Sequence, residues 1–187
     1  MKILYLCMGS LFKTFYDLNT SKLEIFSKGH RNPGSVFVDQ NVILSTEHGP
    51  RGGDEINLIK KDGNYGWPTS SYGDLYFSKK KSPYYKKSHK KYDFIEPIYS
   101  YVPSIGISAI TKVPNNFDEY WEDNYLIASL YGNSIYRVKF DNDYSKILFS
   151  EKIFIGERIR DIKIHKNFII LTFERGLDLG ILKKKIN

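Results

Sequence analysis

Short apolar runs that alternate with turn residues restrict the fold of this chain more than any other feature of its sequence. Clusters of Asp, Asn and Gly separate the runs, as at residues 39–41 and 62–64, where the pattern predicts turns between strands. Long apolar patterns with a helical period are absent from the sequence, and the best candidate helix, residues 116–122, is short. The expected architecture is therefore an all-β sandwich, barrel or propeller.

The apolar runs predict about fourteen strands. They lie at residues 3–6, 14–16, 23–26, 35–38, 42–45, 55–60, 96–101, 107–112, 124–129, 134–140, 147–154, 159–164, 168–173 and 177–182. The sequence has no exact internal repeat, but its hairpin spacing suits propeller blades of four strands each. About fourteen strands make three to four such blades, fewer than a typical closed ring contains. We therefore predict one all-β domain over residues 1–187, folded as a partial β-propeller.

A net charge of +7 raises the possibility of a nucleic-acid partner, but the charge is concentrated in one segment. Seven lysines within residues 78–92 have no acidic residue among them: Lys79, Lys80, Lys81, Lys86, Lys87, Lys90 and Lys91. The rest of the chain is close to neutral. Blocks of like charge usually stay solvated, so we expect a surface loop and no nucleic-acid function, although Tyr84 and Tyr85 leave a stacking contact with a single strand open.

The first residues of the chain, MKILYLCMGSLF, superficially resemble an export signal. The run continues into a pattern of strand, turn at residues 18–21, and strand, without a small-residue cleavage site. We therefore expect strands here and no signal peptide. No apolar stretch is long enough to cross a membrane, and Cys7, as the only cysteine, cannot form an internal disulfide.

Three polar clusters are candidates for chemistry, and the first is GHRNPG at residues 29–34. Arg31 and Asn32 follow a predicted strand and precede a Pro-Gly turn. Arginine presents a fixed fork of donors, so this pair is suited to grip an oxyanion or a quinone oxygen. The alternative is a polar turn in which Arg31 forms an ordinary surface ion pair.

The second cluster is EHGPRGGDE at residues 47–55, which combines acidic residues, a histidine and three glycines. Glycine lets backbone carbonyls approach a ligand closely, and calcium prefers carbonyl and carboxylate oxygens. The spacing differs from that of an EF-hand loop. A glycine-rich β-turn with solvated charges is the alternative interpretation.

The third cluster is ERIRD at residues 157–161. In a regular strand over residues 159–164, Arg158 and Arg160 point to the same side, whereas Glu157 and Asp161 point to the other. Two guanidinium groups on one face repel each other unless an anion lies between them, so the pattern predicts an anion site. Among the other polar residues, His89 and His165 are expected on the surface, and no catalytic triad order or phosphate loop is present.

Six motifs in a fixed order resemble the soluble sugar dehydrogenases that use pyrroloquinoline quinone (PQQ), the glucose/sorbosone dehydrogenase family. They are GHRNP, EHGPRGGDEINLI, DGNYGWP, YVPSIGISAI, WEDNYLIASLYGNSIYRVKF and GERIRDIKI, between residues 29 and 172. The resemblance implies a six-bladed β-propeller with PQQ over the central channel and a calcium ion on the quinone. It also implies a sugar substrate, an aldose oxidised at C1 to the lactone, and a periplasmic or secreted location.

The resemblance assigns a role to each matched position. Arg31 and Asn32 flank the quinone, His48 stands where some members have Gln beside the cofactor, and Ser104 lies near a PQQ carboxylate. Gly49 and Pro50 ligate calcium through their carbonyls, and Arg158 and Arg160 hold the PQQ carboxylates. Glu55 and the carbonyl of Tyr65 match a second calcium site, with Asp74 a weaker candidate.

Two departures from the family pattern weaken the implied activity. Tyr131 stands where some members have a PQQ-binding lysine, and it brings no charge. The family's catalytic histidine precedes GHRNP, and nothing before Gly29 resembles that region, so no catalytic base is assigned. We expect the chain to correspond to the C-terminal portion of such an enzyme, which needs an N-terminal half or another chain to close the propeller. A catalytically inactive binding module is the alternative.

Overall fold

The fold was determined from a computed structural model, which describes residues 3–8, 12–17, 22–74, 85–176 and 178–183. These residues form fifteen strands: β1 (Ile3–Met8), β2 (Phe12–Asp17), β3 (Lys22–Lys28), β4 (Pro33–Asp39), β5 (Val42–Glu47), β6 (Asp54–Leu58), β7 (Gly63–Asn64), β8 (Tyr99–Tyr101), β9 (Ile107–Lys112), β10 (Tyr125–Ser129), β11 (Ser134–Phe140), β12 (Ile147–Phe154), β13 (Ile159–His165), β14 (Phe168–Phe173) and β15 (Leu179–Leu182). Two short 3-10 helices, Lys90–Tyr92 and Glu119–Trp121, complete the secondary structure of this part of the chain.

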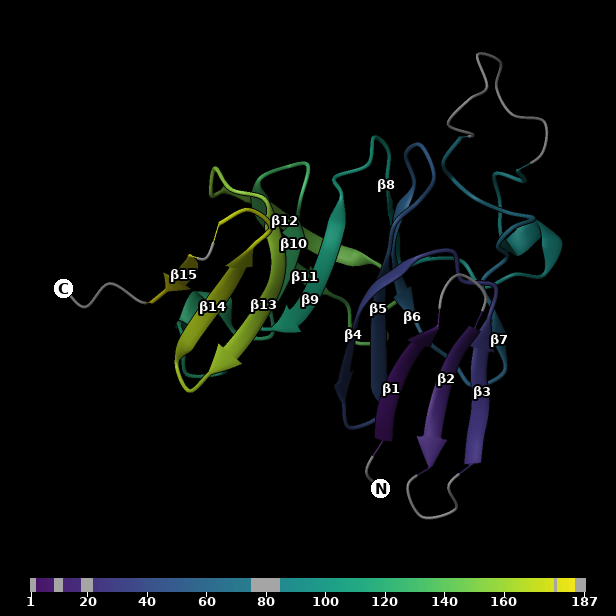
Figure 1. The fold of residues 1–187 in the computed structure, drawn as a ribbon, viewed down its shortest axis with the longest axis horizontal. Helices are drawn as coiled ribbons and strands as arrows, with labels where there is room; N and C mark the ends of the chain where they lie inside the picture. The colour runs from purple at the N-terminus through teal and green to yellow at the C-terminus, as the bar shows by residue number, and fades with distance from the viewer. Residues whose placement is uncertain (1–2, 9–11, 18–21, 75–84, 177, 184–187) are drawn as a thin grey trace.

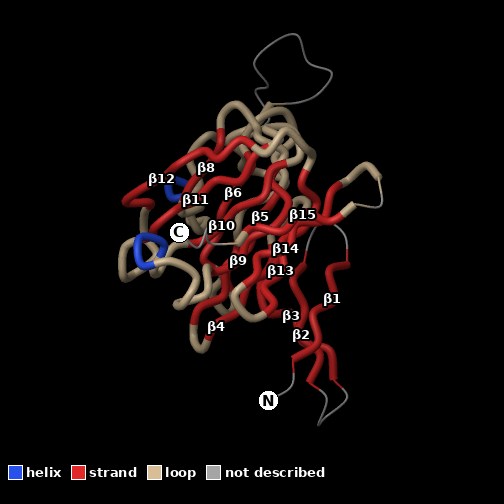
Figure 2. Tube along the Cα trace, turned by 90° about the vertical axis from the view of Figure 1, so that its left-hand side faces the viewer, coloured by secondary structure: helices blue, strands red, loops and turns tan. Residues whose placement is uncertain are grey.

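The strands form four sheets that lie side by side in an open arc (Figure 1), so the predictions of an all-β fold and of a partial propeller are confirmed. Three sheets have four strands each, in the orders β1-β2-β3-β7, β4-β5-β6-β8 and β9-β10-β11-β12. The fourth, β13-β14-β15, has three strands among the described residues. Figure 2, turned by a quarter, shows strands throughout the arc and helix only in its two short turns. No helix in the described part of the chain is long and apolar enough to span a bilayer.

Several local predictions are confirmed and others are corrected. The turn at residues 39–41 joins β4 to β5, and Gln40 there takes a positive φ of 44°. The candidate helix at 116–122 forms only the 3-10 turn Glu119–Trp121, which the Asp118 side chain caps by accepting the Tyr120 amide at 2.9 Å. The strand expected at 96–101 begins only at Tyr99. The expected turn at 18–21 and Lys79–Lys81 lie outside the described residues.

Strand β10 shows where the core lies, because every one of its five residues is buried. Side chains alternate along a strand, so neighbouring residues face opposite sides of the sheet. Tyr125 and Ile127 pack in one apolar cluster with residues of the β4–β8 sheet, and Leu126 and Ala128 pack in a second cluster with residues of the β13–β15 sheet. The core is therefore a set of apolar layers between adjacent sheets.

The first strands of three sheets lie next to one another, since β9 contacts both β4 and β13. All three begin at the same end of the arc, the upper end in Figure 1, which the turn between β5 and β6 also reaches. A groove of about 410 Å³ runs beside them and is lined by residues including Ser35, Ser108, Arg160 and Lys163. Residues that precede these strands are thus brought to one end of the fold.

A truncation in β10 tests the layered core. Ile127→Ala should lower the free energy of unfolding by about 2–5 kcal/mol, because Ile127 is fully buried and its removal leaves a cavity. Leu148→Ala on the outer strand β12, where Leu148 is 59% exposed, should change it by less than about 1 kcal/mol. Urea unfolding followed by circular dichroism measures both, and equal effects would contradict the layered arrangement.

Candidate functional site

The glycine-rich turn at residues 48–53 joins β5 to β6 and packs against a second turn at residues 71–74. Arg51 and Asp74 exchange backbone hydrogen bonds of 3.0 and 2.8 Å between the two turns. Gly53 has a positive φ of 72°, and a Cβ atom there would lie 2.4 Å from the Gly73 nitrogen. Glycine is therefore required at this contact. The acidic residues of the cluster, Glu47, Asp54 and Glu55, are buried, so the alternative of a turn with solvated charges does not describe them.

A buried carboxylate, Asp54, fixes this turn to the segment that leads into β9. Its Oδ2 atom accepts three backbone N–H groups, from residues 105–107, at 3.1, 2.7 and 3.0 Å. Its Oδ1 atom accepts the Gly49 amide at 3.1 Å and the Ser104 hydroxyl at 2.9 Å. The Ser104 hydroxyl, which was predicted to lie near a cofactor carboxylate, thus donates its hydrogen bond to Asp54. Its role toward a ligand stays a prediction. Sequence reasoning missed Asp54, whose only signal is an acidic residue directly after two glycines.

A chain of buried polar side chains runs beneath the turn, from β3 across β5 to β6. His30 contacts Glu47 through Nδ1 and the Ser27 hydroxyl through Nε2, at 2.8 Å. The other Glu47 oxygen accepts the Arg31 amide at 2.9 Å. His30 therefore has both ring nitrogens in use, and it positions Glu47 rather than presenting a free nitrogen to a ligand.

Glu55 lies directly opposite Glu47 in the β5–β6 ladder, so two buried carboxyl groups face each other. Asn57 donates to both, at 3.3 Å to Glu47 and 3.2 Å to Glu55. Burial, and then the charge of Glu47, raises the pKa of Glu55 to about 8. The Glu55 carboxyl group is therefore mostly protonated at neutral pH unless a cation is nearby.

The expectation that His89 lies on the surface is wrong, whereas His165 is exposed as predicted. His89 is 1% exposed, stacks on Tyr72 with ring centroids 5.1 Å apart, and lies 3.8 Å from a Glu55 oxygen. Burial lowers its pKa, although the charge of Glu96 opposes that shift. Its position in a lysine-rich segment hid this, because the segment folds back through backbone hydrogen bonds of Lys86 with the Thr69 carbonyl and the Ser71 amide.

Arg31 lies at the edge of this polar region. Its Nη1 atom donates to the His48 carbonyl at 2.9 Å, and its guanidinium lies 5.4 Å from the centre of the Trp67 ring. The Trp67 ring in turn packs on Tyr85 at 5.3 Å. The Nε atom of Arg31 is buried and makes no hydrogen bond within the described structure. A buried donor of this kind is suited to an acceptor supplied by a ligand.

A small cavity of about 10 Å³, room for about one water molecule, lies among the predicted residues. Its walls include Arg31, His48, Gly49, Glu55, Tyr65 and His89. Five of these six were singled out from the sequence, and His89 was not. Asn32 is exposed, and its carbonyl accepts the His48 amide at 3.0 Å. Asp74 lies away from the cavity in an ion pair with Lys87, at 2.9 Å.

Arg158 and Arg160 converge on one carboxylate, as the predicted anion site requires, but the anion comes from the protein. Glu174, just after β14, contacts Arg158 Nε with one oxygen and Arg160 Nη2 with the other. The expected strand is confirmed, but it carries a β-bulge between Ile159 and Asp161 and is not regular. Sequence reasoning missed both features, because the bulge and the position of Glu174 are set by the pairing of β13 with β14.

The arginine pair and the cavity face the same end of the fold. Burial lowers the pKa of His48, and the charge of Asp54 opposes that shift. The positive charges of Arg31 and Arg160 lower the pKa further, so both arginines act on this imidazole. Tyr131 also lies at this end, 78% exposed, with its amide bonded to the Ile105 carbonyl at 3.0 Å. The structure therefore gathers three arginines, an imidazole and a glycine-rich turn within one region.

Comparisons with known proteins agree with this arrangement. The family model described as glucose/sorbosone dehydrogenase matches residues 12–179. An aldose sugar dehydrogenase of Escherichia coli is 28% identical over 157 residues, which make up 80% of this chain and 40% of that protein. A quinoprotein glucose dehydrogenase of Acinetobacter calcoaceticus is 48% identical over 61 residues, 32% of this chain and 13% of that protein.

The fold has a solved counterpart as well. A crystal structure of a glucose dehydrogenase superposes with a TM-score of 0.76 at 28% identity, covering 89% of this chain and 48% of that one. The chain thus spans less than half the length of the relatives that it matches.

The Asp54 cluster generates one prediction. Asp54→Asn should lower the free energy of unfolding by about 2–4 kcal/mol. The asparagine side chain has an NH₂ group in place of one carboxylate oxygen, and this group donates hydrogen bonds where the oxygen accepted backbone N–H groups. Asp123→Asn removes a largely exposed ion pair to Lys112, 3.0 Å long, and should cost less than about 1 kcal/mol. Chemical unfolding of both variants measures the two losses of stability. Similar losses in the two variants would show that the hydrogen bonds to Asp54 stabilise the chain no more than an exposed ion pair does.

Glu55 generates a prediction about pH. Its pKa of about 8 in the folded chain lies above the usual 4.5, so its favourable contribution is complete below pH 4.5 and is lost as the pH rises through 8. Glu55→Gln does not titrate, so in chelator-containing buffer it should melt at a higher temperature than the native chain at pH 8.5, with little difference at pH 5.

Glu96→Gln is the matched control for Glu55→Gln. Although burial opposes it, hydrogen bonds from the Lys90 amide and the Tyr72 hydroxyl lower the pKa of Glu96. Its contribution is therefore present at pH 8.5 and lost toward acid, and Glu96→Gln should not raise the melting temperature at pH 8.5. A Glu55→Gln variant that also fails to gain stability there would mean that Glu55 is ionised in the native chain.

Proposed function

The chain belongs to the glucose/sorbosone dehydrogenase family, and from this we propose that it is the C-terminal part of a dehydrogenase that uses PQQ and calcium to oxidise an aldose at C1 to the lactone. The observation that carries the proposal is that Arg31 and Arg160 both act on His48 beside the glycine-rich turn, while Arg158 shares the Glu174 carboxylate with Arg160. Three guanidinium groups in one region suit a small ligand with several carboxylates.

The residues present fit PQQ, which is a tricarboxylate with an ortho-quinone. The buried Nε donor of Arg31 lacks a partner in the described structure and is proposed to face the quinone side, together with Asn32 and His48. Arg158 and Arg160 are proposed to hold the carboxylates, and Ser104 and Tyr131 to add neutral hydrogen-bonding groups at the rim. When bound, PQQ supplies the quinone that accepts a hydride. The quinoprotein among the relatives supports this choice.

The residues present also fit calcium, through backbone oxygens. A Cβ atom on Gly49 would lie 2.1 Å from the Gly52 carbonyl oxygen and 2.4 Å from that of Gly53, so carbonyl oxygens crowd this turn. Gly49 and Pro50 are proposed as the carbonyl ligands of a calcium ion, which supplies a positive charge beside the quinone. No group of three or more His, Cys, Asp or Glu in the described residues is arranged for a metal, so backbone ligands are needed.

Glu55 and the Tyr65 carbonyl are proposed to hold a second calcium ion. Both residues line the small cavity, and the Glu55 carboxyl group is kept protonated by burial and by Glu47 when no cation is present. A divalent cation there offsets the repulsion between the two carboxylates. Asp74 is a weaker candidate, because it pairs with Lys87.

Within this chain the proposed work is to bind and orient the cofactor. His30 is an unsuitable base, since both of its ring nitrogens are bonded, and we propose that the base and the remaining blades come from an N-terminal half or from another chain. The chain alone is therefore expected to bind PQQ weakly and to oxidise no sugar. A periplasmic or secreted location is proposed from the family resemblance.

The two tryptophans of the chain test the proposal. Trp67 contacts Arg31, whereas Trp121 packs on Phe117 and Arg137, away from the site. With calcium present, PQQ should quench the fluorescence of Trp121→Phe, in which only Trp67 emits, and a chelator should weaken the effect. Trp67→Phe should show no saturable quenching.

Three results would contradict this picture. Quenching that persists in Trp67→Phe would place PQQ elsewhere, and the absence of saturable quenching in Trp121→Phe would refute cofactor binding. Dye reduction with glucose by the purified chain, given PQQ and calcium, would contradict the assignment of the base to another part of the enzyme.

A further inference from the structure

Glu174 is the only carboxylate in the described residues that is paired with two arginines. One oxygen contacts Arg158 Nε, and the other contacts Arg160 Nη2. In the Arg137–Glu151 ion pair, by contrast, one arginine contacts one glutamate, with 2.8 Å between Arg137 Nε and the Glu151 carboxylate. The bridging arrangement therefore needs an explanation beyond a surface ion pair.

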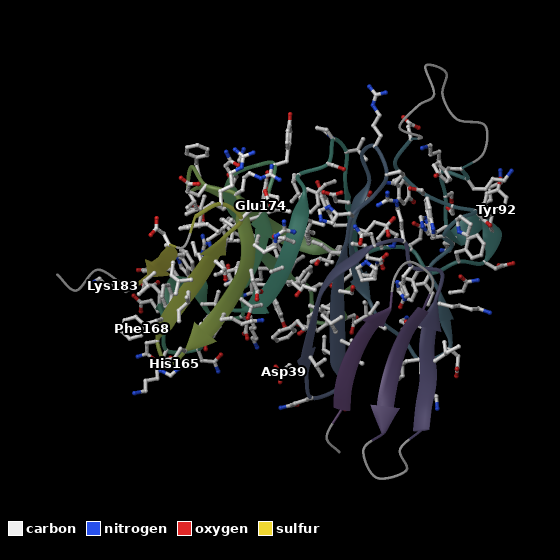
Figure 3. The ribbon with its side chains drawn as sticks, in the orientation of Figure 1. Asp39, Tyr92, His165, Phe168, Glu174 and Lys183 are labelled. Atoms are coloured by element: carbon white, nitrogen blue, oxygen red, sulfur yellow. The ribbon has the colours of Figure 1, made fainter. Side chains whose placement is uncertain are left out.

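The backbone holds Glu174 in this place. Its amide donates to the Arg158 carbonyl at 2.8 Å, which extends the β13–β14 ladder by one pair beyond Ile159 and Phe173. Arg158 and Glu174 are thus cross-strand neighbours, and the bulge after Ile159 changes the direction of the Arg160 side chain. In Figure 3 Glu174 lies at the end of β14 away from His165 and Phe168, which is the end where the proposed site lies.

The contacts leave most of the arginine donors unused. Each guanidinium group carries five N–H bonds, and each arginine bonds Glu174 through one nitrogen. The side chains of Arg158 and Arg160 are 35% and 54% exposed, so their remaining N–H groups are open to solvent. The three side chains together keep one net positive charge.

We propose that Glu174 is a positioning residue for the anionic cofactor, holding both guanidinium groups side by side so that their outer N–H groups meet a ligand carboxylate. The inference rests on the proposed function, because it takes PQQ as the ligand. Without Glu174, two like charges repel and two flexible side chains must be ordered at the moment of binding, which weakens affinity. The free-energy cost of ordering two arginine side chains on binding corresponds to a Kd that is roughly tenfold higher.

Glu174→Gln tests the proposal in the whole chain, with PQQ as the probe and calcium present. Glutamine has the same shape but can accept from only one arginine, because its NH₂ group faces the other as a donor. The variant also gains positive charge, which favours anions at low salt, so Kd is measured in 0.5 M NaCl, about where such attraction is screened. We expect PQQ to bind roughly tenfold more weakly than to the native chain.

Glu151→Gln is the matched control, since it breaks the pair between Arg137 on β11 and Glu151 on β12 and should leave Kd unchanged. A second measurement does not depend on PQQ. The ¹⁵Nε–H resonance of Arg158, assigned with Arg158→Lys, should be protected from solvent exchange in the native chain and should lose that protection in Glu174→Ala, which offers no oxygen to either arginine.

The outcomes separate the inference from the proposed function. Equal or tighter PQQ binding by Glu174→Gln, or an Arg158 resonance that is unchanged in Glu174→Ala, overturns the positioning role. A native chain that binds no PQQ refutes the proposed cofactor, and the Arg158 resonance then still decides whether Glu174 holds the arginine.

Discussion

The site depends on one buried carboxylate that accepts five hydrogen bonds. Asp54 begins β6, yet its oxygens bond the glycine-rich turn before it and the segment that enters the next sheet. An unsatisfied buried carboxylate is costly, so the folded state is favoured when these donors are in place. The same contacts that satisfy Asp54 therefore fix the turn of Gly49 and Pro50 against the start of β9. The same hydrogen bonds therefore stabilise the fold and assemble the site.

Charge around the site is arranged in two layers. Carboxyl groups lie inside, where Glu47 and Glu55 face each other across β5 and β6, and arginines lie nearer to the solvent. Each layer is incomplete without its opposite charge, because Glu55 stays protonated and the arginine pair keeps one positive charge. A cation within and an anion above are the ligands that such layering accommodates. Calcium and PQQ have these charges.

The sequence was sufficient for the architecture and for part of the site. Strand positions followed from short apolar runs, because alternation and turns are local, and Arg31 and Arg158 were identified by their spacing from predicted strands. Glu174 was not, since its partners lie 16 and 14 residues away, across the β13–β14 hairpin, and only the register of that hairpin joins them. His89 was misjudged for a similar reason. Its neighbours in sequence are lysines, whereas its neighbours in space are Tyr72 and Glu55.

The double-sided burial of β10 has a mechanical consequence. Leu126 and Ile127 are adjacent in the chain, yet each belongs to the seam with a different sheet. Detachment of either neighbouring sheet uncovers one side of β10 and leaves the other side covered. The β13–β15 sheet can therefore detach from its end of the arc while the β9–β12 sheet keeps half of its apolar cover, and substitutions one residue apart report on different seams.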